Sequence, residues 1–138
     1  MKFEDIYQFF EDPPPIYLNK ELAVCYVLAV LIDRDSYGTE LIQLLGREYP
    51  DYRLSDTVLY SALKFLEDQS AIEGYWKKVE GRGRPRRMYR LYPEYQLKAR
   101  ELGDLWQQYM RGRRADDRLK EDPLKKDRVL TSSVIPRD

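Results

Sequence analysis

The chain has 138 residues, of which 43% are hydrophobic and 35% are charged, a composition typical of one compact domain with exposed arms. The absence of histidine excludes histidine-dependent zinc sites, Ser-His-Asp triads and Cys-His dyads. The single cysteine, Cys25, excludes an intramolecular disulfide and lies in an apolar run, as expected for a buried thiol in a reduced, cytoplasmic protein. We therefore expect no enzyme activity, no metal and no cofactor.

The formal net charge is zero, but the charge is unevenly distributed. Residues 1–76 carry 6 basic and 14 acidic side chains, whereas residues 77–90 carry 7 basic side chains and 1 acidic side chain. A dense cationic segment on an acidic body indicates that this segment binds a polyanion such as nucleic acid. The longest apolar run, residues 22–32, is shorter than the roughly 20 residues that span a bilayer, so no membrane partner is expected.

Residues 3–11 are predicted to form a short helix, because apolar and aromatic side chains recur at helical spacing from Phe3 to Phe10. Three prolines, residues 13–15, end this helix and form a stiff connector. An isolated helix of this length is marginally stable in water. Its aromatic face must therefore pack on the body of the protein or on a partner chain.

The next two predicted helices form the start of the compact domain. Asn19 is a suitable N-cap for a helix over residues 20–34, which is apolar nearly all round and is predicted to be the central core helix. Ser36 is predicted to cap a second helix, over about residues 37–47.

Ser55 is predicted to cap a third helix, over residues 56–69, with one apolar stripe and one polar face. The buried stripe consists of Leu59, Ala62, Leu63 and Leu66. The opposite face consists of Thr57, Tyr60, Ser61, Lys64 and Asp68. Hydroxyl groups on such a face can meet base edges in the major groove of DNA without steric bulk.

After Ile72 the apolar pattern changes from a helical to a two-residue period. Residues 72–79 and 86–92 are predicted to form a β-hairpin around the arginine-rich sequence EGRGRP. Two strands alone are barely stable, so the hairpin must pack against helices. The arginines at its tip would reach phosphates or a narrow minor groove.

Pro93 suits the start of a last long helix. Its apolar residues follow steps of 4 and 3, a heptad-like seam that we assign to a dimer interface: Tyr95, Ala99, Leu102, Trp106 and Tyr109. The seam is lost from Arg111 onward, so we expect a charged, flexible tail over residues 116–138.

The order of these elements indicates a mainly α-helical fold with a small β-hairpin. It is the plan of a winged helix-turn-helix with an added N-terminal helix and a C-terminal dimerisation helix. We divide the chain into an N-terminal helix with connector (1–17), a winged-helix DNA-binding domain (18–92), a dimerisation helix (93–115) and the tail (116–138).

The segments YGTELIQLL, LSDTVLYSALKFLEDQSAIEGYW and GRPRRMYRLY resemble the PadR family of transcriptional regulators over about residues 20–92. The matching positions are Tyr37-Gly38, Leu59-Tyr60, the run of Leu63, Leu66 and Glu67, Arg84-Pro85-Arg86 and Tyr89-Arg90-Leu91. Val58, Ser61 and Phe65 depart from the family, which often has threonine, proline and a basic residue there. The third helix therefore offers little positive charge, and the wing must supply more of the affinity.

The resemblance implies a homodimer that binds double-stranded DNA, usually as a repressor. The proline-linked aromatic helix at the N-terminus is also similar to that of a cyanobacterial member of the family that acts in the circadian clock. The predicted DNA contacts are Tyr37, Ser55, Thr57, Tyr60, Ser61, Lys64, Lys77, Lys78, Arg82, Arg84, Arg86 and Arg87. The predicted dimer contacts are Phe3 and Phe10 together with the seam of the last helix.

Several alternatives stay open at this stage. A ligand-responsive regulator of the multidrug type would place an aromatic pocket, with Trp106, at the dimer interface; a small-molecule effector is possible, but the sequence does not indicate one. A protein-interaction module would keep the fold without binding DNA. The wing arginines would then form a solvated loop, the face around Tyr60 would be an ordinary helix surface, and Tyr37 would pack beside Gly38.

Overall fold

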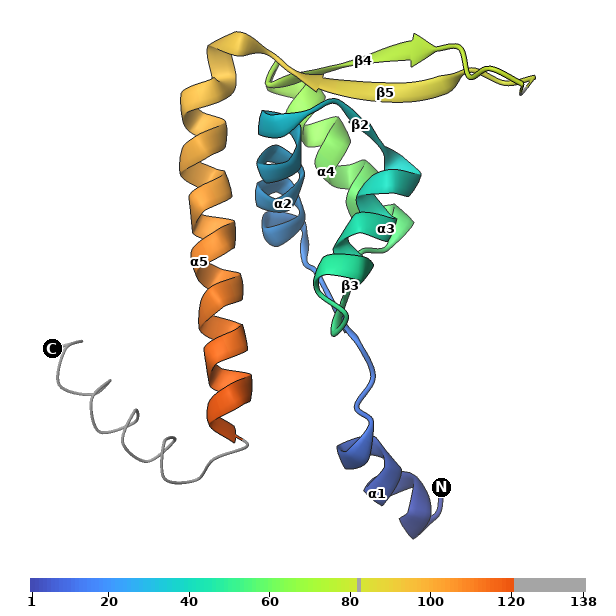
Figure 1. The fold of residues 1–138 in the computed structure, drawn as a ribbon, viewed down its shortest axis with the longest axis vertical. Helices are drawn as coiled ribbons and strands as arrows, with labels where there is room; N and C mark the ends of the chain where they lie inside the picture. The colour runs from blue at the N-terminus through green and yellow to red at the C-terminus, as the bar shows by residue number, and fades with distance from the viewer. Residues whose placement is uncertain (82, 121–138) are drawn as a thin grey trace, which may run out of the picture.

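The computed structural model describes residues 1–81 and 83–120 (Figure 1). In chain order the elements are α1 (Phe3–Glu11), β1 (Ile16–Tyr17), α2 (Lys20–Asp33), β2 (Ser36–Tyr37), α3 (Gly38–Glu48), β3 (Tyr52–Arg53), α4 (Asp56–Asp68), β4 (Ile72–Lys77), β5 (Arg86–Leu91), η1 (Pro93–Tyr95) and α5 (Gln96–Lys120). This order confirms the predicted, mainly helical winged fold. Arg82 and the predicted tail beyond residue 120 lie outside the described residues.

Helix α2 is the centre of the fold, since it is apolar on all sides. It begins at the predicted cap, where the Asn19 side chain accepts a hydrogen bond from the Leu22 N–H (2.8 Å). Helix α4 packs on one side of α2 and α5 on another (Figure 1). The Tyr26 hydroxyl donates a hydrogen bond to the Leu41 carbonyl oxygen (2.6 Å), which joins α2 to α3. Burial raises the pKa of this hydroxyl.

Helix α5 packs on α2 through small and aromatic side chains. A Cβ added to Gly103 would lie 3.3 Å from the Ala29 Cα, so the glycine allows the two helices to approach closely. Trp106, only 2% exposed, packs against Tyr26 and Tyr49 with ring centroids 5.4 and 5.5 Å apart. One face of α5 is therefore used within its own chain.

This packing corrects two of the predicted dimer contacts. Ala99 and Trp106 are buried within one chain, because their face of α5 lies on α2, and neither side chain is available to a partner. Tyr95 and Leu102 are partly buried against the same core, and Tyr109 is exposed. The heptad-like spacing predicted a packing face of α5 correctly, but it did not show which helix covers that face.

The last helix also differs in its bounds from the prediction. Pro93 begins a short 3₁₀ turn, and α5 follows from Gln96. The helix continues to Lys120, beyond the predicted end at residue 115. None of the described helices is both long enough and apolar enough to cross a bilayer.

The wing is a three-stranded antiparallel sheet in the order β2–β5–β4, whereas the sequence predicted only the hairpin. In the added strand, Ser36 pairs with Tyr89 and Tyr37 pairs with Met88. The third strand joins the base of the hairpin to the start of α3, and this supplies the support that two strands alone would lack.

Ser36 is not the N-cap of α3, contrary to the prediction. It is fully buried in β2, and its hydroxyl donates a hydrogen bond to Glu40 Oε1 (2.6 Å). Tyr37 occupies the N-cap position of α3 and makes no side-chain capping bond. Pairing with β5 uses the backbone of Ser36 in the sheet, so the helix begins at Gly38, one residue later than predicted.

Two further strands of two residues each form a parallel pair, β1 with β3. Ile16 pairs with Tyr52 and Tyr17 with Arg53, and the Leu18 N–H donates to the Arg53 carbonyl oxygen (3.0 Å). The pair ties the segment before α2 to the connector between α3 and α4. Strands this short have no periodicity from which they could be predicted.

Helix α1 stands apart from the rest of the chain (Figure 1), and none of its residues is buried. Its exposed apolar side chains are Phe3, Ile6, Tyr7, Phe9 and Phe10. Phe9 and Phe10 contact each other edge to face with centroids 5.2 Å apart. The aromatic face of this amphipathic helix therefore does not pack on its own domain.

The packing of α5 on α2 predicts a large cost for Trp106→Ala. Removing a buried indole should lower the free energy of unfolding by about 3–5 kcal/mol. Leu97→Ala, at a position on the same helix that is 82% exposed, should change it by less than about 0.5 kcal/mol. Urea denaturation of the two variants measures both. A loss below about 1 kcal/mol for the Trp106 variant would show that α5 does not pack on α2 in solution.

Candidate nucleic-acid interface

Helix α4 presents a polar face outward, as predicted. Ser55 begins the helix, and its Oγ accepts a hydrogen bond from the Val58 N–H (3.2 Å). The exposed side chains of this face include Thr57, Tyr60, Ser61 and Lys64. The Lys64 ammonium lies 3.5 Å from the Asp68 carboxylate one turn later, so the only lysine of the helix is partly neutralised. This face therefore offers hydroxyl groups more than charge.

Tyr60 lies over the start of α3, where Gly38 makes room for its ring. A Cβ added to Gly38 would lie 2.5 Å from the Tyr60 hydroxyl oxygen and 3.5 Å from Leu59 Cδ2. A side chain at residue 38 would therefore displace the tyrosine. The two pairs Tyr37-Gly38 and Leu59-Tyr60, which are far apart in the sequence, thus belong to one local packing arrangement.

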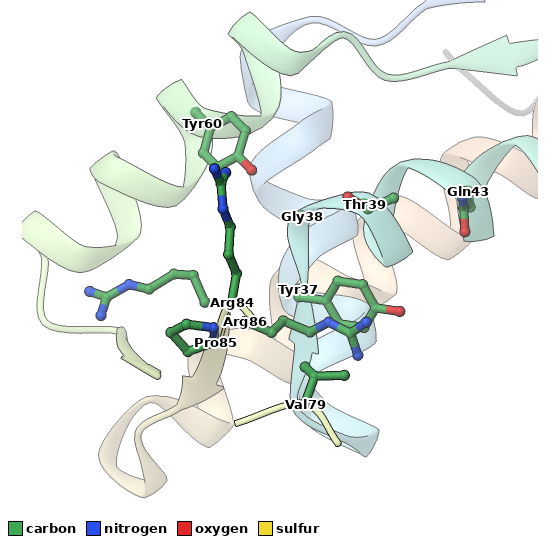
Figure 2. Close-up of a pocket in the computed structure, with 10 residues that line it drawn as sticks. Tyr37, Gly38, Thr39, Gln43, Tyr60, Val79, Arg84, Pro85 and Arg86 are labelled. Carbon is green, nitrogen blue, oxygen red and sulfur yellow. The ribbon is translucent and has the colours of Figure 1, made fainter. Parts of the chain in front are cut away.

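A hollow of about 480 Å³ lies between α3, α4 and the wing, and we call it the wing pocket. Its lining residues are Tyr37, Gly38, Thr39, Gln43, Tyr60, Val79, Arg84, Pro85, Arg86 and Arg87. The pocket brings together five of the predicted DNA contacts from three separate elements (Figure 2). All the charged side chains among these described residues are basic, so the pocket favours an anion.

Arg84 and Arg86 lie differently in the wing pocket. The Arg86 guanidinium lies 3.9 Å from the centroid of the Tyr37 ring, a close cation–π contact. Figure 2 shows Arg86 extending toward Tyr37 and Arg84 pointing the other way. Arg84 is exposed, whereas Arg86 and Tyr37 are half-buried. Tyr37 therefore packs within the protein, at the edge of the predicted contact surface.

Two arginines of the basic segment are paired with carboxylates. The Arg87 guanidinium lies 3.8 Å from Glu67 Oε2 in α4, and 5.2 Å from the centroid of the Trp76 ring. Arg90 pairs with Glu73 across the hairpin. Apart from Arg90, the exposed basic side chains of the described wing are Lys77, Lys78 and Arg84. The charge available to a polyanion is thus concentrated toward the tip of the hairpin.

The base of the wing is held by polar contacts that were not predicted. The Tyr75 hydroxyl donates a hydrogen bond to Asp35 Oδ2 (2.5 Å), and this bond raises the pKa of the tyrosine. Hydrogen bonds from Tyr92 and then from Arg90 lower the pKa of the Glu73 carboxyl. The alternation of polar side chains along the strands marks them as exposed, but it does not identify their partners.

A second hollow, of about 650 Å³, lies between α2, α3 and α5. Tyr26 and Trp106 form part of its wall, and its rim mixes acidic and basic side chains: Asp33, Glu40, Glu48, Arg34 and Arg47. A mixed rim does not select one sign of ligand charge. The described residues contain no group of three or more side chains suited to hold a metal ion.

A family model for PadR-like transcriptional regulators matches residues 27–96. Among solved structures, the circadian clock associated protein Pex from Anabaena is 67% identical, with 82% of this chain and 98% of that chain covered and a TM-score of 0.77. Pex from Synechococcus is 69% identical, with 80% and 98% covered and a TM-score of 0.75. No curated protein matches the chain.

A transcriptional regulator from Clostridium thermocellum is 25% identical, with 70% of this chain and 93% of that chain covered and a TM-score of 0.55. The predicted resemblance to the PadR family is confirmed, as is the similarity of the chain to a cyanobacterial clock protein. The polar face of α4, the basic wing and these matches lead to one conclusion: the chain belongs to the PadR-like family and is a DNA-binding transcriptional regulator, not an enzyme.

Proposed function

We propose that this protein represses transcription as a two-fold homodimer, with α4 in the major groove and the wing on phosphates or in the minor groove. The observation that carries the proposal is the wing pocket, where the tyrosines of β2 and α4 meet the arginines of the hairpin. A helix and a wing that border one basic hollow can contact adjacent parts of a duplex.

The charges of the two elements support different roles for them. Helix α4 carries Lys64 against Asp56, Glu67 and Asp68, so it attracts phosphates weakly. Hydroxyl groups of Tyr60 and Ser61 are suited to base edges. We therefore assign sequence reading to α4, and most of the electrostatic attraction to the exposed basic residues of the wing.

The proposed dimer uses the apolar surfaces that one chain leaves exposed. The aromatic face of α1, with Phe3 and Phe10, is covered by none of the other residues that the structure describes. Helix α5 has a second apolar stripe beside the face that packs on α2, formed by the exposed Leu105 and Tyr109 and by the partly buried Leu102. Exposed apolar patches of this kind are typical of protein–protein interfaces. We assign the interface to α1 and this stripe of α5.

The setting of the proposed regulator is the cyanobacterial circadian clock. The support is the identity to Pex from Anabaena, which is described as circadian clock associated and of which nearly the whole chain is covered. Disrupting the gene should change the period of a rhythmic reporter in its host. An unchanged period would contradict this setting without affecting the proposal of DNA binding.

Selection of duplexes from a random pool is the experiment that tests DNA recognition. The proposed function predicts enrichment of a palindromic site whose half-sites are separated by about one turn of DNA, roughly 34–36 Å. A pool that shows no enriched sequence after several rounds would contradict sequence-specific binding. The enriched duplex is the probe for the variants below.

Gly38→Ala should weaken binding to the selected duplex as much as Tyr60→Ala does, by about 1–3 kcal/mol, because the added methyl group displaces the tyrosine. In the Tyr60→Ala background the same change should add little, which a double-mutant cycle measures. Gly46→Ala, in the same helix, is the control, since its nearest neighbouring atom would be 3.9 Å away. Additive losses would show that Gly38 acts independently of Tyr60.

Arg84→Ala should reduce affinity and flatten the dependence of log Kd on log salt by roughly 2, since each phosphate contact contributes about 0.9 and a dimer loses two contacts. The thermal midpoint should not change, because the side chain is exposed at the hairpin tip. Arg100→Ala removes the same charge from the exposed surface of α5 and should leave the slope unchanged. If the wild type and both variants show the same dependence of log Kd on log salt, Arg84 is a solvated loop residue and does not contact phosphate.

Replacing both Phe3 and Phe10 by serine should convert the dimer to a monomer without unfolding the domain, because neither side chain is buried in its own chain. Sedimentation velocity at tens of micromolar measures the change. Trp76→Ser removes another exposed aromatic side chain, from the wing, and should leave the dimer intact. A wild-type protein that sediments as a monomer would contradict the proposed assembly.

A further inference from the structure

Arg87 connects the recognition helix to the wing. It lies in β5, and its guanidinium is 3.8 Å from the Glu67 carboxylate in the last turn of α4. The same guanidinium lies 5.2 Å from the centroid of the Trp76 ring in β4. Both charged side chains are little more than one-third exposed. Arg87 therefore joins its own strand, β5, to two other elements, α4 and β4.

Gly74 in β4 provides the space that the Arg87 side chain occupies. A Cβ added to this glycine would lie 2.6–2.7 Å from three atoms of the guanidinium group. The guanidinium thus lies against the strand backbone, in a place that any other residue would fill. Glycine in the interior of a strand normally weakens it, and it often marks a close approach of other atoms.

Tyr89, directly opposite Gly74 in the register of the hairpin, belongs to the same cluster. Burial raises the pKa of its hydroxyl, and Glu67 raises it further, while a hydrogen bond with Arg87 lowers it. The ring is buried beneath the sheet. Glu67, Arg87, Gly74 and Tyr89 therefore form one contact group between α4 and the wing, which we call the helix–wing bridge.

The connection between α4 and the wing is otherwise short. Only residues 69–71 separate the helix from β4, and Ser70 has a positive φ of 58°, a conformation uncommon outside glycine. A turn of three residues fixes where β4 begins. The angle between β4 and α4 then depends on contacts farther along the two elements. The helix–wing bridge is such a contact, one turn of helix and several strand residues away.

We propose that the helix–wing bridge sets the angle between α4 and the wing, and that Arg87 is a positioning residue rather than a DNA contact. The inference rests on the proposed function, because it assigns a role within the same interface. An Arg87 side chain that turned to a phosphate would leave the Glu67 carboxylate without this partner on the DNA-binding side of the protein. Arg84, three residues nearer the tip, carries the contact instead.

The angle matters because both elements must reach the duplex together. Arg84 lies three residues before Arg87, outside β5 and nearer the tip, and three residues of extended chain span up to about 10 Å. A small rotation at the bridge therefore moves the tip by ångströms. Binding through two linked sites is lost when their geometry does not allow simultaneous contact. Loosening the bridge should therefore weaken the wing contact while leaving the α4 contact intact.

The experiment compares Glu67→Gln with Glu73→Gln, using the selected duplex as the probe. Each change removes one negative charge and one carboxylate that pairs with an arginine of β5, but Glu73 pairs with Arg90 inside the hairpin and does not touch α4. Glu67→Gln should lower affinity roughly tenfold, since two exposed ion pairs are lost per dimer. Glu73→Gln should bind as tightly as the wild type or slightly tighter. Tighter binding of both variants would overturn the proposal, because it would show that a released Arg87 contacts phosphate.

Gly74→Ala provides a second variant in which every charge is kept and only the guanidinium is displaced. It should reproduce the affinity loss of Glu67→Gln, and hydroxyl-radical footprints of both variants should lose protection at the wing but not at α4. Wild-type affinity for Gly74→Ala would contradict the bridge. If the wild-type protein enriches no duplex at all, the proposed function itself fails. That outcome differs from one in which the wild type binds and these variants do not change it.

Discussion

The burial of α2 on several sides is the constraint on which the rest of the structure depends. An all-round apolar helix must be covered by more than one neighbour, and here α4 and α5 cover it. The contact between Gly103 and Ala29 brings α5 close, and Trp106 fills the space beyond it. Because α4 is held on the opposite side, its apolar stripe is used in the core and its polar face points outward. The orientation of the recognition helix thus follows from the packing of α2.

The pairing of β2 with β5 attaches the wing to the packed helices. Ser36 and Tyr37 pair with the returning strand of the hairpin, and α3 begins at the next residue. The base of the wing is therefore attached to the start of α3, over which Tyr60 also lies. The wing pocket exists because three elements meet at Gly38, a residue whose lack of a side chain allows the contact. Pairing with β2 thus adds to the contacts that hold the hairpin relative to α4.

The sequence predicted the elements that are marked by an apolar period or by a helix-capping residue. It missed the features that depend on contacts between segments far apart in the chain. Asn19 and Ser55 begin their helices as predicted, and the buried stripe of α4 is confirmed. The Ser36 side chain is suited to capping a helix, but the residue lies in a strand of two residues. Such a strand is too short to show an alternating apolar pattern. The apolar spacing of α5 could not show that α2, and not a second copy, covers Ala99 and Trp106. The all-round apolar character of α2 was the one signal that a second covering helix was needed.

The arginines of the basic segment divide between two tasks that composition alone does not separate. Arg86, Arg87 and Arg90 contact Tyr37, Glu67 and Glu73 of the same chain, whereas the exposed basic side chains without such a contact lie toward the tip. Residues 1–76, which include α4, carry 6 basic and 14 acidic side chains, so this part of the chain repels a duplex while the wing attracts it. Contact by α4 then requires that the wing attract the duplex at an angle that also admits the helix to the groove. Affinity and sequence reading thus both depend on the angle between α4 and the hairpin, which is set where the two meet. They do not depend simply on the number of arginines in the chain.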